Sequence, residues 1–205
     1  RRVRLTRPWV FIPPLPPTVV NKGDHVLNGV LLAVGTGVIL GIAPSVGVGA
    51  TGRTLPTAPL DALLAAGLLA AEFFIPVVLG ALVPDVDTAF GKHRKSLHNV
   101  FVVAVLVAYP LVFDNLHFVW LGVVSHLVLD MAGSARGVAF AYPLTSQEWN
   151  LPGGVSTTSG YATPLTVGIT LVELGLMAAV HYYVVPLDTT GQTIQQATAQ
   201  MAALI

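Results

Sequence analysis

The chain is short of charge. Of its 205 residues only 10% are charged and 54% are hydrophobic, whereas an ordinary soluble domain has roughly 25% charged residues. A soluble fold of this size would have too little polar surface, so the composition indicates a protein solvated by lipid. The formal net charge is zero and no basic run dominates the chain, which excludes a nucleic-acid binder as the function class.

The chain also contains no cysteine. Disulfide frameworks and zinc sites built on thiolates are therefore excluded. No signal-peptide pattern is visible at the start, because the basic residues 1–7 run directly into a proline-rich stretch, residues 8–17.

Long apolar runs dominate what remains. A transmembrane helix needs about 20 predominantly apolar residues, and three runs satisfy this: Val26–Ala50, Ala62–Val83 and Ala162–Val185. Two shorter runs, Ser96–Phe113 and Leu116–Met131, form a predicted helical hairpin that either crosses the membrane or re-enters it. The predicted fold class is therefore all-α, an integral membrane bundle of about four or five transmembrane helices.

We divide the chain into three parts on this basis: a proline-rich cytoplasmic segment (1–24), a membrane-embedded domain (25–187) and an amphipathic tail (188–205) that lies on a membrane surface. With five spans and a cytoplasmic N-terminus, nine of the ten Lys and Arg residues fall on the inner side. Basic residues accumulate in cytoplasmic segments, so we expect an inner-membrane protein in this orientation.

Most of the histidines and aspartates fall at this same inner face. They come from four separate pieces of chain: the start of the first span, the end of the second, the start of the third and the end of the fourth. Ionisable groups in or near membrane segments are costly and tend to mark function. The residues concerned are Asp24, His25, Asp85, Asp87, His93, His98, His126 and Asp130.

In two of these chain segments the spacing of the residues indicates how their side chains could bind an ion. His126 and Asp130 are four residues apart on a predicted helix, so their side chains share one face and can grip one ion. Asp85 and Asp87 follow Pro84, which ends the helix and leaves both carboxylates in an extended loop. Mixed imidazole and carboxylate ligands suit zinc, iron, nickel or manganese better than calcium or magnesium.

Two acids lie in the middle of predicted spans, Glu72 and Glu173. A charge there costs about 2.5–3.5 kcal/mol, so each side chain must be protonated or paired inside the bundle. A structural hydrogen bond between helices and a proton relay remain equal alternatives.

The motifs resemble those of the membrane-bound metal-dependent hydrolases of the YdjM-like family. The matching pieces are His25, Val-Pro-Asp-Val-Asp at 83–87, His-Arg-Lys-Ser-Leu-His at 93–98 and Gly-Val-Val-Ser-His-Leu-Val-Leu-Asp at 122–130, followed by Gly137 and Tyr-Pro-Leu at 142–144. A looser similarity links the chain to the helical zinc phospholipase C and nuclease superfamily. The resemblance implies metal ligands, or residues that support them, at His25, Asp85, Asp87, His93, His98, His126 and Asp130.

We therefore expect a membrane-embedded hydrolase that acts at the inner interface on a phosphoester or lipid ester. A divalent metal, with zinc preferred and manganese or iron as alternatives, would be held by His25, Asp85, His93, His126 and Asp130. Asp87 or His98 would be the general base, and Arg94 would steady a phosphate. Membrane lipids and membrane-protein partners are expected, but no nucleic acid. The rival class is a non-catalytic membrane subunit with a structural metal site.

The distribution of basic residues predicts the topology. A single cysteine placed near Arg53 should react with an impermeant thiol reagent from outside, and one near Lys92 should not. The native chain has no cysteine that would add background. The reverse labelling pattern would overturn the orientation.

Overall fold

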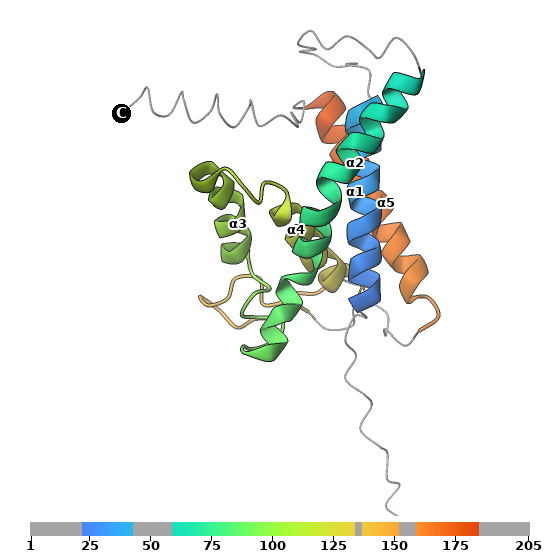
Figure 1. The fold of residues 1–205 in the computed structure, drawn as a ribbon. Coiled ribbons are helices and arrows are strands. Elements are labelled where there is room, and N and C mark those ends of the chain that lie inside the picture. Colours follow the sequence, from blue (N-terminus) through green and yellow to red (C-terminus); the bar gives the residue numbers. More distant parts are fainter. Residues whose placement is uncertain (1–21, 43–58, 134–136, 152–158, 185–205) are drawn as a thin grey trace, which may run out of the picture.

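The computed structural model describes residues 22–42, 59–133, 137–151 and 159–184. Within these ranges the chain forms five α-helices, one 3-10 helix and no β-strand, which confirms the predicted all-helical bundle (Figure 1). The proline-rich stretch and the tail (188–205) lie outside the described residues. In chain order the elements are α1 (Lys22–Ile42), α2 (Pro59–Leu82), η1 (Pro84–Ala89), α3 (Val100–Phe113), α4 (Val119–Gly133) and α5 (Ala162–Tyr183).

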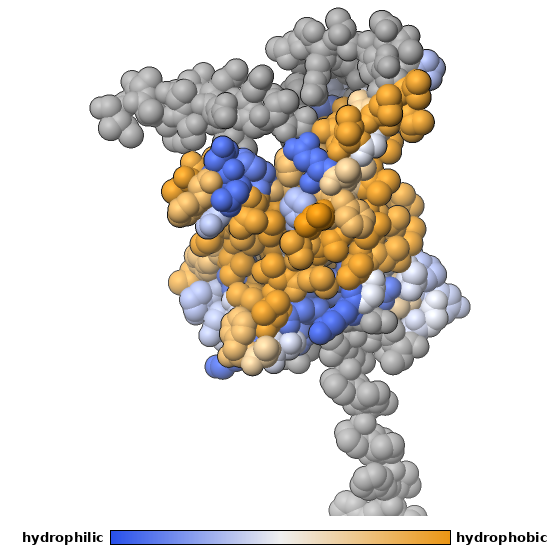
Figure 2. Space-filling view, viewed as in Figure 1, coloured by the Kyte–Doolittle hydropathy of each residue, from blue (hydrophilic) through white to orange (hydrophobic). Residues whose placement is uncertain are grey.

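Three helices, α1, α2 and α5, are long and apolar enough to cross a membrane. They run side by side, with α1 in contact with both α2 and α5. Figure 2 shows the result on one face of the molecule, where a broad hydrophobic belt is bounded above and below by hydrophilic residues. This distribution fits a membrane protein.

The α3–α4 hairpin is shorter than a full crossing requires. Its helices have 14 and 15 residues, which at 1.5 Å per residue gives about 21–23 Å against a hydrocarbon core of about 30 Å. At the tip, Asp114 adopts the left-handed conformation (φ 52°) and its N–H donates to the carbonyl of Pro110 at 2.9 Å. The lengths favour the re-entrant alternative, and either alternative returns the chain to the same face.

Small residues allow the helices to approach closely. A Cβ added at Gly37 of α1 would overlap the backbone of Ala70, and one added at Gly122 of α4 would overlap the carbonyl oxygen of Val77. Close approach through small residues is the usual way in which membrane helices associate. Both contacts hold α1 and α4 against α2, and they thereby bring three chain segments to one end of the bundle.

The two connections at that end are ordered by specific contacts. Pro84 starts η1 directly after α2, and Asn99 caps α3 by accepting hydrogen bonds from the N–H groups of Phe101 and Val102. Residues 137–151 cover this region: the Ala139 N–H donates to the carbonyl of Arg94 at 3.1 Å. The loop between η1 and α3 is therefore fixed on both sides.

The packing predicts that Gly122→Ala destabilises the protein. The added methyl group must push α4 away from the Val77 carbonyl, and overpacking of this kind costs about 1–3 kcal/mol. Thermal unfolding in detergent should show a lower midpoint. Gly67→Ala in α2 is the matched control, because a Cβ there meets nothing within 4 Å. Equal midpoints for the two variants would contradict the close packing.

Candidate metal centre

Seven of the eight histidines and aspartates selected from the sequence come together with Arg94 in one buried cluster, which we call the His/Asp cluster. The eighth, Asp24, instead accepts a hydrogen bond from Thr163 at 3.1 Å. Four segments supply the cluster: the first turn of α1, η1, the loop after η1 and the C-terminal half of α4. Every member makes a polar contact of 3.9 Å or less with at least one other member. The members are His25, Asp85, Asp87, His93, Arg94, His98, His126 and Asp130.

The protonation of His126 is set by the end of α2. Its Nδ1 lies 2.6 Å from the carbonyl oxygen of Ala81. A carbonyl only accepts hydrogen bonds, so Nδ1 donates, and in the neutral ring the lone pair is on Nε2. The backbone thus turns the ligand atom of His126 toward the cluster.

Asp87 determines which ring nitrogen carries the proton in two histidines, His93 and His98. Its Oδ1 accepts from Nδ1 of His93 at 3.0 Å, and its Oδ2 accepts from Nδ1 of His98 at 3.0 Å. The N–H of Leu97 also donates to Oδ2, at 3.2 Å. A carboxylate that accepts from one ring nitrogen fixes the ring and frees the other nitrogen for a metal. Both Nε2 atoms are therefore left with a lone pair.

Four ligand atoms then converge with no hydrogen between them. Nε2 of His98 lies 3.2 Å from Nε2 of His126, and Oδ2 of Asp130 lies 3.4 and 3.6 Å from these two nitrogens. Oδ1 of Asp85 lies 3.9 Å from each nitrogen. A tetrahedral site with bonds of about 2.0–2.2 Å has edges of about 3.3–3.6 Å. The three distances among His98, His126 and Asp130 are close to this range, whereas the two distances to Asp85 are somewhat longer. We call these four atoms the four-atom cage.

The charge of the cluster also favours a bound metal ion. Three buried carboxylates, Asp85, Asp87 and Asp130, face a single buried guanidinium, that of Arg94. With neutral histidines this leaves two uncompensated negative charges, and buried charges persist only when they are paired or coordinate a metal. One divalent cation would balance the cluster.

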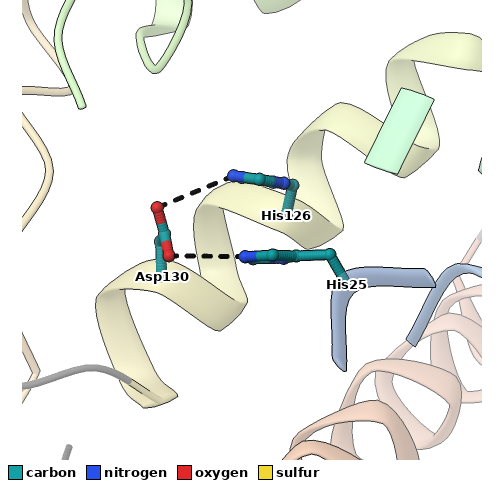
Figure 3. Close-up of side chains that lie close together, drawn as sticks. All are labelled: His25, His126 and Asp130. Atoms are coloured by element: carbon teal, nitrogen blue, oxygen red, sulfur yellow. Dashed lines mark ion pairs between the residues drawn. The ribbon is translucent and has the colours of Figure 1, made fainter. Parts of the chain in front are cut away.

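His25 lies beside His126, and both rings face Asp130 (Figure 3). Its ring stacks on that of His126, with centroids 3.7 Å apart and planes 10° apart. Nε2 of His25 faces Oδ1 of Asp130 at 3.6 Å, while His126 faces Oδ2. One ligand atom from each of these three residues lies within 4.8 Å of the others, as does one from each of Asp85, His93 and His98. By proximity alone, each group is a candidate for holding a metal ion.

Arg94 is the only cation in the cluster as the structure describes it. Its side chain is 2% exposed, and its Nη2 donates to Oδ1 of Asp130 at 3.3 Å. The backbone at Arg94 has a φ of 64°, an uncommon value for a residue other than glycine. The hydrogen bond from Ala139 to its carbonyl holds this conformation. Arg94 is thus directed inward by the fold.

A second polar group, which the sequence analysis did not find, lies deeper in the bundle. Asn28 donates to Oε2 of Glu173 at 3.0 Å and to Oγ1 of Thr170 at 2.9 Å. Ser125 contacts Oδ1 of Asn28 and donates to Oε2 of Glu173 at 2.8 Å. In the sequence, only position could have indicated Asn28 and Ser125, since Asn28 is one turn after His25 and Ser125 precedes His126.

The contacts of this group bear on whether the mid-span acids make structural hydrogen bonds or form a proton relay. Glu173 makes the interhelical hydrogen bonds expected of the structural alternative. Glu72 differs, because its side chain is exposed on α2. No contact between described residues joins the two acids, so the geometry gives no support to a relay that uses both.

A scan against protein-family models gives no match to the chain. Searches of the curated proteins and of the solved structures likewise find no match. The interpretation of the cluster therefore depends on its own geometry.

The geometry predicts that Asp87→Asn weakens metal binding although Asp87 is not one of the four cage atoms. The amide cannot accept from both histidines in the same way, and loss of such an orienting partner typically costs about 10–100-fold in metal affinity. Competition titration with zinc in detergent measures this. Glu148→Gln is the control, since Glu148 pairs with Lys95 at 3.8 Å outside the cluster. Equal affinities for both variants would contradict the role of Asp87.

Proposed function

We propose that the protein is a membrane-embedded, metal-dependent hydrolase that acts on a phosphoester or lipid ester at the membrane interface. The observation that carries this proposal is the four-atom cage, in which two oriented imidazoles and two carboxylates converge, with five of their separations between 3.2 and 3.9 Å. The resemblance to the YdjM-like hydrolases, which rests on the same residues, supports the same reaction class.

The ligand set favours zinc. Two nitrogens and two oxygens suit Zn²⁺, with Mn²⁺ and Fe²⁺ as alternatives. A bound ion of this kind supplies Lewis acidity and lowers the pKa of water from 15.7 toward about 7. His98, His126, Asp85 and Asp130 would hold it.

The contacts of Asp87 and His98 favour roles other than the general base expected for either residue. Both oxygens of Asp87 accept hydrogen bonds, so its carboxylate is engaged in orienting His93 and His98. Nε2 of His98 lies within the cage. We therefore propose that Asp87 is a positioning residue and that His98 is a ligand.

Arg94 supports a phosphoester as the bond that is cleaved. Its buried guanidinium lies against Asp130, which also contributes to the cage. A guanidinium is a planar donor fork that matches the oxygens of a phosphate. Arg94 would therefore bind an anionic substrate next to the metal.

The surface around η1 supports a substrate that is part of the membrane. Asp85 and Asp87 are buried, whereas Val86 and Phe90 beside them are 51% and 70% exposed. The same short segment thus sends carboxylates inward and apolar side chains outward. Such a surface suits contact with lipid, and a lipid bound there would have its polar head near the cluster. We assign this end to the cytoplasmic face of the inner membrane because of the basic residues around it.

The alternative, a non-catalytic subunit with a structural metal, is favoured by the depth of the cluster. His25, His98 and His126 are each 1% exposed or less, and structural sites are closed whereas catalytic sites keep a position for water. His93 distinguishes the two readings, because 25% of its side chain is exposed. This opening is consistent with access from outside.

Asp130→Asn separates the two functions. The variant keeps the shape of the side chain but removes the charge shared by the cage and Arg94. For a catalytic site, metal content and hydrolysis of a panel of phospholipids and water-soluble phosphoesters should fall together, by more than about 100-fold, with the unfolding temperature nearly unchanged.

The control is Asp114→Asn at the hairpin tip, where the side chain is 87% exposed and Asn also tolerates the left-handed backbone. It should keep both metal and activity. A native chain that hydrolyses nothing, with a large drop in unfolding temperature for Asp130→Asn, would instead support the structural subunit, because metal binding energy is then folding energy.

A further inference from the structure

The four-atom cage does not use every ligand atom in the cluster. Three buried side-chain atoms of the cluster have no hydrogen-bond partner among the described residues: Nδ1 of His25, Oδ2 of Asp85 and Nε2 of His93. Buried polar atoms are nearly always paired. Asp85 and His93 belong to one of the groups that could hold a metal ion, so a single cation could satisfy both of their unpaired atoms.

Both atoms can only accept. Nδ1 of His93 donates to Asp87, so Nε2 of the neutral ring carries the lone pair. Asp85 places Oδ1 in the cage, 3.9 Å from His98 and His126, which leaves Oδ2 as the second oxygen of an ionised carboxylate. The partner that both atoms lack must therefore be a cation or a proton donor, and the residues described around them supply neither.

We propose that the cluster binds two divalent cations: one in the four-atom cage, and a second on Oδ2 of Asp85 and Nε2 of His93, with the Asp85 carboxylate bridging the two. Asp85, His93 and His98 each offer a ligand atom within 4.8 Å of the others, which is the proximity that a shared centre needs. The inference deepens the proposed function and rests on it only for the substrate.

The second ion belongs on the His93 side and not on the His25 side. Arg94 already places positive charge against Oδ1 of Asp130, the oxygen that faces His25. The His25 and His126 rings are also nearly parallel. Because an imidazole lone pair lies in the ring plane, parallel rings do not converge on one ion. His25 thus supports Asp130 and stacks on His126.

Two divalent ions would exceed the two uncompensated negative charges of the cluster, so a pair of ions fits an anionic substrate, whose phosphate together with a bound hydroxide would offset the excess. Two-metal sites, with ions about 3.5–4 Å apart, clamp the attacking and leaving oxygens in phosphoester cleavage. His93, on the second ion, is also the cluster histidine with the most exposed side chain, 25% against 1% or less for the others. The second ion would therefore lie nearer the protein surface than the first.

The experiment is a metal count on the full chain in detergent, with Mn²⁺ as the probe. Native mass spectrometry should find two ions per chain, and electron paramagnetic resonance should show an exchange-coupled pair. His93→Gln should bind one ion with the uncoupled signal of isolated Mn²⁺. His117→Gln is the matched control, because His117 pairs with Asp114 at the hairpin tip, and it should keep two coupled ions.

One ion per native chain, or two coupled ions in His93→Gln, would overturn the inference. The native-chain measurement needs no variant, so poor folding of His93→Gln cannot hide the answer. Hydrolysis measured on the same samples separates the two proposals. Two coupled ions without hydrolysis of any phosphoester would overturn the proposed function but not the two-ion site. One ion per chain with hydrolysis would overturn the two-ion site but not the proposed function.

Discussion

Buried negative charge is the constraint on which this structure depends. Asp85, Asp87 and Asp130 are each less than 10% exposed at one end of an apolar bundle, where an uncompensated carboxylate is costly. The fold answers this cost with donors: Arg94 for Asp130, and two imidazoles and a backbone N–H for Asp87. Oδ2 of Asp85 receives no such donor from the described residues. The remaining demand is for cations, and this is what makes the cluster a candidate metal centre.

The bundle must be tightly packed for these groups to meet. His25, Asp85 and His126 come from chain segments about 40–60 residues apart, and their side chains are short. Glycine contacts bring α1 and α4 within backbone distance of α2. The end of α2 contributes to the cluster in two ways. Its Ala81 carbonyl orients His126, and the helix that continues it, η1, supplies Asp85 and Asp87.

The polar group around Glu173 and the His/Asp cluster share two helices. Asn28 and Ser125 join α1 and α4 to α5, one turn from His25 and directly beside His126. Interhelical hydrogen bonds of this kind are modest in strength but directional. They fix the rotation of α1 relative to α4. This rotation decides whether the rings of His25 and His126 stack on each other and face opposite oxygens of Asp130.

The sequence alone determined the helices, because a run of apolar residues long enough for a bilayer has few other stable forms. It also selected the cluster residues, since His126 and Asp130 share a helical face and ionisable groups near membrane spans are rare. It could not assign their roles. Whether His98 is a ligand or a base depends on which nitrogen meets Asp87, and the left-handed backbone that turns Arg94 inward depends on Ala139. These are contacts between distant segments, so only the tertiary structure decided them.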